Sequence, residues 1–564
     1  MTFYGRSERV EAKVTVSKRE VKVTPAAIVK LGVLPALFYL TSFIVLTYPL
    51  IRRFSTHLFA DPWDGLVFQW DLWWVNKAVT ELHQSPWQTS YLNYPFGVSL
   101  LPHTLNIFNG FVAIPLLRFL TLVQVYNVLV IFSFAACGVT AFLLAHYFTR
   151  SYWSSLFAGF VFTFSSYHFA HMEGHLNLVS LEWVPLFVLC WYVLMVRPGI
   201  TMAIAAGIVL FAVILCDYYY FFYCSLISVI IFAWYGLHTK NAGFFLERKY
   251  LVSLTVFLGV VLATSGPLVI SLLLLNSADP ITGHNPLNNS MDALAPFIPG
   301  SHWRFANLTR FYWGRLPGDA NENSVYLGWA VIFLLLYVWR RRPAVPSLGL
   351  WFFIVFCFGV LALGPVLHVW GAAYSVVTLP YAILEKAFPP IQASGVPVRM
   401  MIISTLAASV LCAVALAEAS RGSLWEQLFA ALVIVILVVE YLPKPRISSA
   451  LPVPKFVSIL KTKPGNGAVL DTVSDPFQIM YHQTVHEKPM ALAYSVLSRT
   501  PHSVAMKGEE LKRLIENGDY IKLRNEYKIE YLVTDAAKDL ERENRSVRSL
   551  FGDSKVKLYE LRPE

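Results

Sequence analysis

Long apolar runs recur from residue 31 to residue 442, and they constrain the fold more than any other feature of the chain. Most have about 20 residues, the length that an α-helix needs to cross the hydrocarbon core of a bilayer. The runs are 31–50, 124–147, 153–171, 176–196, 200–217, 219–238, 250–275, 325–339, 348–368, 397–418 and 424–442. They predict a polytopic α-helical membrane protein of about 11 spans with additional interfacial helices.

The composition fits a membrane protein and excludes a nucleic-acid partner. Hydrophobic residues make up 56% of the chain and charged residues only 14%, whereas soluble domains have about 25% charged residues. The net charge is +10, but Lys and Arg are scattered and form no basic, Gly-rich or zinc-binding module. Contact with anionic membrane lipids accounts for the excess of positive charge.

The distribution of Lys and Arg predicts the orientation in the membrane. Residues 1–30 are polar and basic, so the N-terminus is expected in the cytoplasm. The first apolar run has no small-residue cleavage signal and is interpreted as a retained anchor. The arginines Arg340 to Arg342 follow a later run and are expected on the same side. The segment 443–564 is then extracytoplasmic, in a multi-pass protein of the cell membrane.

The apolar segment 104–122 is the exception to this pattern. It contains Asn106, Asn109 and Arg118 and meets the next run almost without a connector. If it crossed the bilayer, the positive-inside rule would fail for the following helices. We therefore expect it to lie at the outer interface or to re-enter, within a first outer loop over 51–123. The domain 31–442 then has a second long outer loop over 276–324.

This topology brings the polar clusters to the outer face. The motif His171-Met172-Glu173-Gly174-His175 lies at the outer end of the third span, and Asp217 lies between the fifth and sixth. The loop 276–324 carries several charged residues, among them Arg304. Ionisable residues at membrane depth are costly and are therefore candidates for function.

The first outer loop opens with Asp61-Pro62-Trp63-Asp64. We expect Asp64 to be a catalytic base, because the following Gly65 leaves room for a substrate beside its carboxylate. Pro62 stiffens the chain after Asp61, which favours a supporting, structural or metal-holding role for Asp61. A solvated acidic loop is the alternative interpretation of both residues.

Arg399, in Pro397-Val398-Arg399 at the start of the tenth span, is the candidate for binding a phosphate. Its planar guanidinium can contact phosphate oxygens bidentately. The alternative is an arginine that only anchors its helix at the headgroups. His171 and His175 have the i, i+4 spacing that permits metal binding. Because Glu173 lies off that helix face and no third ligand is evident, hydrogen bonding is the favoured interpretation.

Residues 443–564 differ from the rest, since charged residues are frequent and the apolar runs have the length of strands. Strands are predicted at 468–470, 530–533 and 556–559, and helices at 508–516 and 536–549. The segment is long enough for one small α/β domain. Tyr481-His482-Gln483-Thr484-Val485-His486 is its one polar cluster that could face a ligand, and a structural role is equally compatible.

A family resemblance rests on these features together. The first outer loop with its paired acids, the polytopic core and the soluble outer domain resemble the GT-C glycosyltransferases. More narrowly, the chain resembles a group of largely uncharacterised prokaryotic GT-C-like membrane proteins. This likeness rests on Tyr94-Pro95-Phe96-Gly97, Phe164-Ser165-Ser166-Tyr167-His168 with His175-Leu176-Asn177-Leu178, and Gln483-Thr484-Val485-His486.

The resemblance implies an enzyme that transfers a sugar from a polyprenyl-phosphate donor to a glycan, lipid or protein acceptor. It implies the acid role for Asp64 first and for Asp61 second, and a non-spanning helix in the first outer loop. Some GT-C enzymes need a divalent metal such as Mg²⁺ or Mn²⁺ and others do not, so the cofactor stays open. The predicted substrate-binding residues are Arg399, Glu173, His171, His175, Asp217, Arg304 and Tyr94.

Two other classes of function stay open. A transporter or flippase of lipid-linked sugars would also need acids and arginines in the membrane, but no repeated halves are evident. A non-catalytic assembly or scaffold protein is the third possibility. The sugar, the acceptor, the linkage stereochemistry and the oligomeric state do not follow from the sequence.

Overall fold

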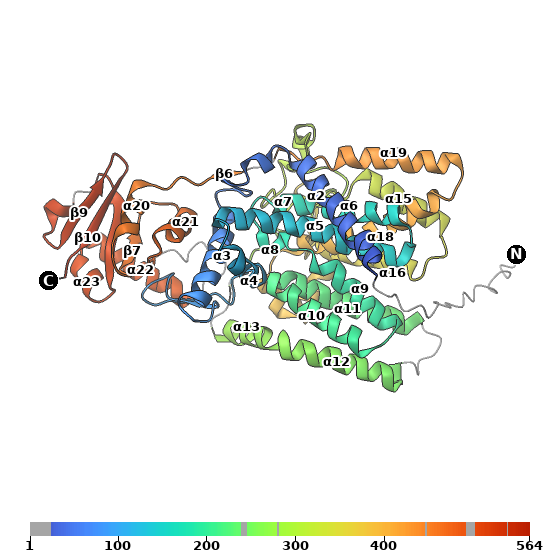
Figure 1. Cartoon of the computed structure of the whole chain (residues 1–564), viewed down its shortest axis with the longest axis horizontal. Helices are drawn as coiled ribbons and strands as arrows, with labels where there is room; N and C mark the ends of the chain where they lie inside the picture. The colour runs from blue at the N-terminus through green and yellow to red at the C-terminus, as the bar shows by residue number, and fades with distance from the viewer. Residues whose placement is uncertain are drawn as a thin grey trace.

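We analysed a computed structural model of the chain, which describes residues 24–238, 245–278, 281, 283–445, 448–491, 502–537 and 540–563. Most of the predicted cytoplasmic segment 1–30 therefore lies outside the described residues. Figure 1 shows an elongated molecule, with a helical bundle along most of its length and a small sheet at one end. The segments α3 and α4 lie between the two parts (Figure 1).

Each apolar run of the sequence contains a helix or a pair of helices. The main helices of the bundle are α2 (Leu34–Thr47), α5 (Leu122–Thr149), α6 (Tyr152–Thr163), α7 (Ser166–His171), α8 (Leu176–Val179), α9 (Trp183–Val196), α10 (Ile200–Cys216), α11 (Tyr218–His238), α12 (Arg248–Thr264), α13 (Gly266–Ala278), α15 (Trp329–Arg341), α16 (Leu348–Ala362), α18 (Met401–Ala419) and α19 (Leu424–Glu440). Helices satisfy every internal backbone hydrogen bond, which is why apolar runs in a bilayer adopt them.

Four helical segments among the described residues are each long and apolar enough to cross a membrane. They are Pro25–Thr47, Leu122–Thr149, Tyr218–His238 and Pro397–Ala419. The pair α12 and α13, bent by 54° at its break, makes a fifth if it counts as one span. These helices confirm a polytopic membrane protein, while the total of about 11 spans stays a prediction.

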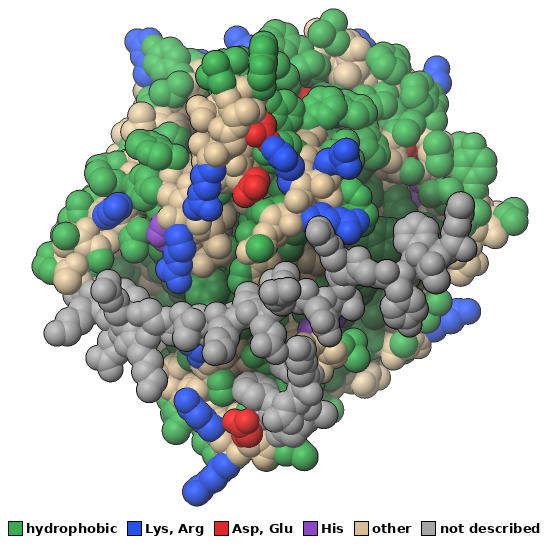
Figure 2. All heavy atoms as spheres, turned by 90° about the vertical axis from the view of Figure 1, so that its right-hand side faces the viewer, with side chains coloured by type: hydrophobic (Ala, Val, Ile, Leu, Met, Phe, Trp, Pro, Cys, Tyr) green, Lys and Arg blue, Asp and Glu red, His purple; other side chains and the backbone are tan. Residues whose placement is uncertain are grey.

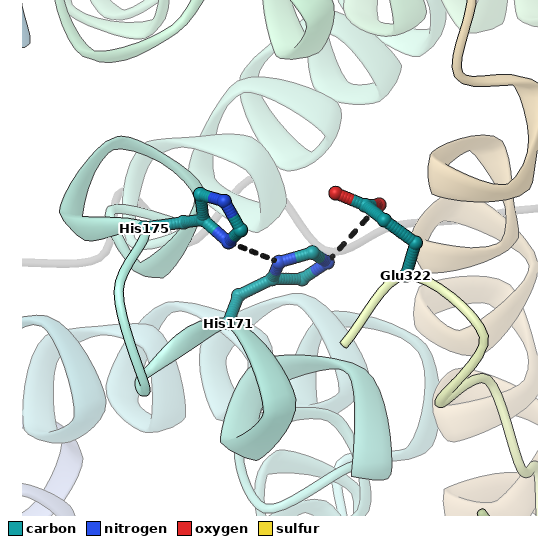
Figure 3. A group of neighbouring side chains, drawn as sticks. All are labelled: His171, His175 and Glu322. Carbon is teal, nitrogen blue, oxygen red and sulfur yellow. Dashed lines mark hydrogen bonds and ion pairs between the residues drawn. The ribbon is translucent and has the colours of Figure 1, made fainter. Parts of the chain in front are cut away.

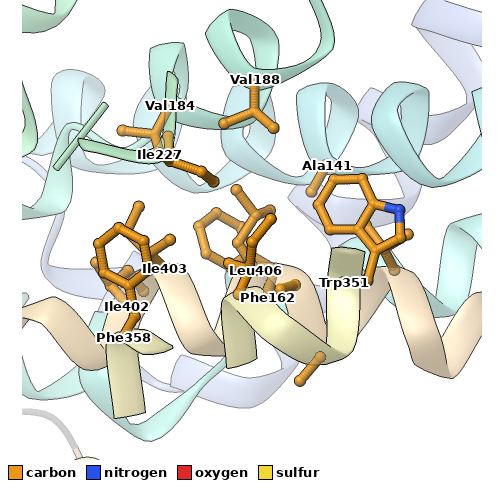
Figure 4. Close-up of a cluster of buried hydrophobic side chains, with 14 of the residues drawn as sticks. Ala141, Phe162, Val184, Val188, Ile227, Trp351, Phe358, Ile402, Ile403 and Leu406 are labelled. Carbon is orange, nitrogen blue, oxygen red and sulfur yellow. The ribbon is translucent and has the colours of Figure 1, made fainter. Parts of the chain in front are cut away.

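Helix α18 forms the centre of the bundle. Nearly all of its residues are buried, and it contacts α5, α6, α15, α16 and α19. Figure 4 shows Ile402, Ile403 and Leu406 of this helix beside Phe162, Trp351 and Phe358 from its neighbours. Many of the remaining α18 side chains are Ala or Ser. Small side chains let helices approach closely, which matters in lipid because the hydrophobic effect does not drive helices together there.

The first outer loop contains α3 (Asp64–Thr80), β2 (Gln88–Thr89), β3 (Val98–Ser99) and α4 (Ile107–Leu116). Helix α4 lies within the segment 104–122, which was predicted not to span the membrane. It has 10 residues, which at 1.5 Å per residue is about 15 Å, half of a hydrocarbon core. Asn109, on its buried face, donates a hydrogen bond to Ser180 at 2.9 Å. The helix is therefore held against the bundle by polar as well as apolar contacts.

Shorter elements complete the helical part. They are α1 (Pro25–Ile28), η1 (Val29–Val33), η2 (Leu50–Arg53), β1 (His57–Leu58), η4 (Ala306–Thr309), α14 (Arg310–Trp313), β4 (Val366–Val369), β5 (Ala372–Thr378), α17 (Pro380–Ala387), η5 (Pro389–Ala393) and η6 (Pro397–Met400). Segments α1 and η1 lead directly into α2, and η6 leads directly into α18.

The C-terminal segment has a four-stranded sheet in the order β7-β8-β10-β9. Strand β7 (Ala468–Asp471) is parallel to β8 (Ile529–Asp535), with Val469 opposite Tyr531. Strand β10 (Val556–Leu561) pairs antiparallel with β8 and with β9 (Val547–Gly552). The other elements are β6 (Ser449–Ala450), α20 (Lys455–Thr462), α21 (Pro476–His486), α22 (His502–Glu516), α23 (Tyr520–Asn525) and α24 (Leu540–Glu543).

One predicted element of this segment is wrong. The helix predicted at 536–549 is a short α24 followed by strand β9. The stretch from Leu540 to Arg548 is rich in charged residues, which favours a helix by local propensity. Pairing with β10 decides the outcome instead, because Val547 is buried at the edge of the sheet core.

The C-terminal segment is fastened to the first outer loop. Strand β6 pairs antiparallel with β1, so His57 lies opposite Ala450. The indole Nε1 of Trp70 donates to Oε1 of Gln483 at 2.7 Å, and the amide of Gln483 donates to the Tyr91 carbonyl at 2.7 Å. The cluster predicted to face a ligand or to be structural therefore contributes a buried glutamine that joins the two parts.

The end of the molecule opposite the sheet is basic. Figure 2 shows Lys and Arg side chains there, with few Asp and Glu. Arg150 and Arg197 follow α5 and α9, Arg342 follows α15, and Arg421 follows α18. Basic connections on one side are the pattern that the positive-inside rule describes. The orientation itself, with the N-terminus in the cytoplasm, stays a prediction.

Candidate active site

Asp61 caps the start of α3. Its Oδ1 accepts hydrogen bonds from the backbone N–H groups of Trp63 at 3.0 Å and Gly65 at 3.1 Å. Burial raises the pKa of the Asp61 carboxyl to about 6, against the lowering effect of these two hydrogen bonds. The carboxylate therefore holds the turn, while the supporting role of Asp61 in catalysis stays a prediction.

Asp64 is the first residue of α3, and its side chain is half exposed. Its Oδ2 lies 3.2 Å from Nε2 of His175. Burial would raise the pKa of Asp64, but the hydrogen bond and the charge of His175 outweigh it and hold that pKa below its usual value. The same contact raises the pKa of His175 against the effect of burial. Asp64 is therefore ionised at neutral pH and open on one side.

The turn between α7 and α8 carries the histidines to these acids. The N–H of Asp61 donates to the carbonyl of Glu173 at 2.5 Å. A Cβ placed on Gly174 would lie 3.0 Å from Cβ of Asp64 and 3.2 Å from Oδ2 of Asp61. A larger residue at this position would have to displace the side chains of both acids by a few tenths of an ångström. The Glu173 carboxylate points to the long outer loop, with Oε1 3.3 Å from Nδ1 of His302.

Three side chains converge beneath this turn, as Figure 3 shows. Nδ1 of His171 lies 3.1 Å from Nδ1 of His175. On the other side of the ring, Nε2 of His171 lies 3.8 Å from Oε2 of Glu322. Glu322 comes from the segment before α15, about 150 residues further along the chain. The predicted pair of histidines therefore has an acidic neighbour that the spacing of the motif did not reveal.

Arg399 lies on η6, at the start of the central helix, and is buried. Its Nε donates to both carboxylate oxygens of Glu322, at 3.0 and 3.2 Å. The guanidinium also lies over the ring of Tyr219, 4.6 Å from the centroid. The charge and hydrogen bonds of Arg399 outweigh burial and hold the pKa of Glu322 well below its usual value. Arg399 is thus part of a buried ion pair, and its role as a phosphate ligand stays a prediction.

The polar contacts form a continuous series from Asp64 through His175, His171 and Glu322 to Arg399. Its members come from α3, the turn after α7, the loop before α15, and η6. The candidate base and the candidate phosphate ligand therefore belong to one cluster, which we call the acid–histidine cluster.

The other predicted site residues have different positions. Asp217 accepts from Asn177 at 2.7 Å and from the N–H of Tyr219 at 2.8 Å, so it holds the start of α11 and with it the ring beneath Arg399. Tyr94 donates its backbone N–H to Met490 in the C-terminal segment. Arg304 is exposed and donates its backbone N–H to Leu442.

An apolar groove opens beside the acid–histidine cluster and has a volume of about 430 Å³. Its lining comes from α11, α13, α17 and η5, and includes Phe222, Leu272 and Phe388. The rings of Phe222 and Phe388 are stacked with centroids 5.6 Å apart. Tyr219 lines this groove and also lies under the Arg399 guanidinium. Tyr219 therefore links the lining of the groove to Arg399 of the cluster.

The molecule has the fold of a polytopic membrane protein of the GT-C type. It is similar to the arabinofuranosyltransferase AftD from mycobacteria, with a TM-score of 0.58, 13% sequence identity, and coverage of 94% of this chain. The chain spans 41% of the length of AftD. At this level of identity the likeness establishes the fold alone.

The chain belongs to the family described as a domain of unknown function, DUF6311, which matches residues 80–441. No curated protein matches the sequence. Weaker structural likenesses include ArnT from Cupriavidus metallidurans bound to undecaprenyl phosphate (TM-score 0.47, 12% identity, 94% of this chain and 97% of that chain). Another is the oligosaccharyltransferase from Archaeoglobus fulgidus (TM-score 0.43, 12% identity, 90% and 69%).

Proposed function

We propose that this protein is a membrane glycosyltransferase. It takes a sugar from a polyprenyl-phosphate donor and transfers it to a glycan, lipid or protein acceptor on the outer face of the membrane. The observation that carries this proposal is the shared Tyr219, which lines the apolar groove and stacks under Arg399. An apolar chain in the groove would bring its phosphate to a guanidinium.

The groove and Arg399 suit the two ends of such a donor. The groove is lined mainly by aromatic and aliphatic side chains, which can bury an isoprenoid tail. Glu322 occupies Nε and Nη2 of Arg399, so Nη1 is the donor group that a phosphate would meet. A guanidinium keeps its charge in this buried position, which makes it suitable for a phosphate at membrane depth.

Asp64 suits the other half of the reaction. Its carboxylate would take the proton of the acceptor hydroxyl while the oxygen forms a bond to the anomeric carbon. The bond between that carbon and the phosphate oxygen breaks, and the polyprenyl phosphate leaves with its charge next to Arg399. His175 orients Asp64 and stabilises its ionised form through the 3.2 Å contact.

The decisive experiment incubates the purified protein with radiolabelled polyprenyl-phospho-sugars and detects transfer or hydrolysis. Asp64→Asn keeps the size of the side chain and removes the base, so turnover should fall about 10²- to 10⁴-fold. Asp319→Asn, in an exposed part of the long loop, is the matched control and should retain activity. A folded Asp64→Asn protein that turns over at the wild-type rate would refute the role of Asp64.

A transporter or flippase of lipid-linked sugars is the second candidate function. The observation that favours it is the break between α12 and α13, where the axis bends by 54°. Broken helices at membrane depth are frequent in secondary transporters. Movement of a labelled lipid-linked sugar across protein-containing vesicles, without cleavage of the sugar–phosphate bond, would support this function over the enzyme.

A further inference from the structure

We infer that His171, His175 and Glu322 form a binding site for one divalent transition-metal ion of the Zn²⁺ type. Each residue offers one ligand atom, and these three atoms all lie within 4.8 Å of one another. Figure 3 shows both imidazoles and the carboxylate pointing toward one another. Bonds of about 2.0–2.2 Å to one ion place ligand atoms about 3–4 Å apart, so small side-chain rotations would close the site.

One nitrogen atom of His171 has no hydrogen-bond partner among the described residues. This atom is Nε2, which is buried. Nδ1 of His171 faces Nδ1 of His175 at 3.1 Å, where two lone pairs would repel unless one ring carries its proton there. Buried polar atoms without partners are rare in folded proteins. A cation bound to Nε2 of His171 and to Glu322 would give this buried nitrogen a partner.

The surroundings prepare the ligands for a metal. Oδ2 of Asp64 contacts Nε2 of His175, which directs the other ring nitrogen, Nδ1, into the proposed site. A carboxylate that accepts the second N–H of a ligating histidine is the usual outer support of such sites. Arg399 fixes Glu322 from the opposite side, through Nε at 3.0 Å. Two of the three ligands, His175 and Glu322, are thus held in place by neighbouring side chains.

The charge of the cluster also favours a cation. Asp64, Glu173 and Glu322 are carboxylates around the turn at Gly174, and the guanidinium of Arg399 is hydrogen-bonded to Glu322. Burying carboxylates in excess of positive charge is unfavourable unless a further cation compensates them. Two imidazoles and one carboxylate favour an ion of intermediate softness over Mg²⁺, which prefers oxygen ligands.

A bound ion would have coordination positions left over, because three protein ligands do not fill a tetrahedral or larger shell. Such an ion supplies a positive charge that can contact a phosphate oxygen, between Asp64 and Arg399. The inference adds a cofactor to the proposed active site, but metal binding is measured on the resting protein. Loss of metal binding and loss of sugar transfer can therefore be observed separately.

The test uses the full-length protein in detergent after removal of metals with a chelator. Titration with Co²⁺ is followed by its visible absorption, and Zn²⁺ content is measured by mass spectrometry after dialysis. We expect one ion per chain, with binding abolished in His171→Leu and Glu322→Gln. Asp64→Asn, which removes only the support of His175, should lower the affinity about 10- to 100-fold. His83→Ala, an exposed histidine of the first outer loop, is the control and should bind as wild type does.

Wild-type protein that binds neither ion above background would overturn the inference. So would equal affinity in the wild type and in folded His171→Leu. If the variants fail to fold, X-ray absorption spectroscopy of the wild-type Zn²⁺ complex identifies the ligands of the ion instead. Scattering from two imidazoles is expected, and a shell without imidazole would reject this site.

Discussion

The ion pair between Arg399 and Glu322 allows a quantitative prediction. Arg399→Met keeps an unbranched apolar stem and removes the charged guanidinium. Both partners are buried, with side-chain exposures of 7% each, so the substitution leaves an uncompensated carboxylate. Breaking a buried pair in this way lowers stability by about 3–5 kcal/mol. Loss of the contact with Tyr219 adds about 0.5–2 kcal/mol.

A double-mutant cycle separates the interaction energy of the ion pair from the other effects of each single substitution. Glu322→Gln combined with Arg399→Met leaves no buried charge, and a neutral amide can find partners at lower cost. We expect the double variant to be more stable than Arg399→Met alone by about 2 kcal/mol or more, as residues of one network couple by 0.5–3 kcal/mol. The free energy of unfolding is measured in mixed micelles with increasing SDS, in the presence of a chelator. Additive losses in the double variant would refute the buried pair as the source of the effect.

Three further predictions concern Asp61, Gly174 and Gln483. Asp61→Asn should keep the cap on α3 and flatten the pH dependence of stability. The pKa of the acid rises from 3.8 to about 6 on folding, so wild-type stability falls as pH rises through this interval, by at most roughly 3 kcal/mol and less after solvent screening. Gly174→Ala should lower sugar transfer without unfolding the protein, because its Cβ would press on Asp64; Gly199→Ala, with open space around it, should be neutral in the same assay. Gln483→Leu should make the C-terminal segment more sensitive to limited proteolysis, since two buried hydrogen bonds to the first outer loop are lost.

The helices of the bundle could be predicted because lipid leaves the backbone few choices. An apolar run of about 20 residues must satisfy its own hydrogen bonds, and a helix does so without a partner. The sequence reading therefore agrees with the structure along runs such as 124–147, where α5 lies. The secondary structure of the C-terminal segment is harder to predict, because pairing between distant strands overrides local propensity, as in β9.

The candidate site could be predicted only in part, because some of its contacts join residues that are distant in the sequence. Asp64, His171 and His175 lie in motifs whose spacing shows them to be neighbours or near neighbours. Glu322 has no such signal, since it is one acid in a long polar loop and reaches Arg399 only through the packing of the bundle. Tyr94, whose motif suggested substrate binding, donates its backbone N–H to Met490, and its role in binding a substrate stays a prediction.

The substitution Glu322→Gln tests whether Arg399 binds the phosphate of the donor or has only a structural role. In the resting protein Glu322 is the anion that Arg399 binds, so a donor phosphate must compete with it. If Arg399 binds the donor, removal of this competitor should tighten the binding of a polyprenyl phosphate to metal-free protein. The gain should be about tenfold, the equivalent of about 1.4 kcal/mol and one charge-assisted hydrogen bond. The ligand should also raise the unfolding temperature of the variant more than that of the wild type, because it neutralises a buried guanidinium that has lost its partner. If Arg399 serves only to hold the loop before α15, the affinity will stay the same or fall as the loop loosens, and the phosphate role of Arg399 will be rejected.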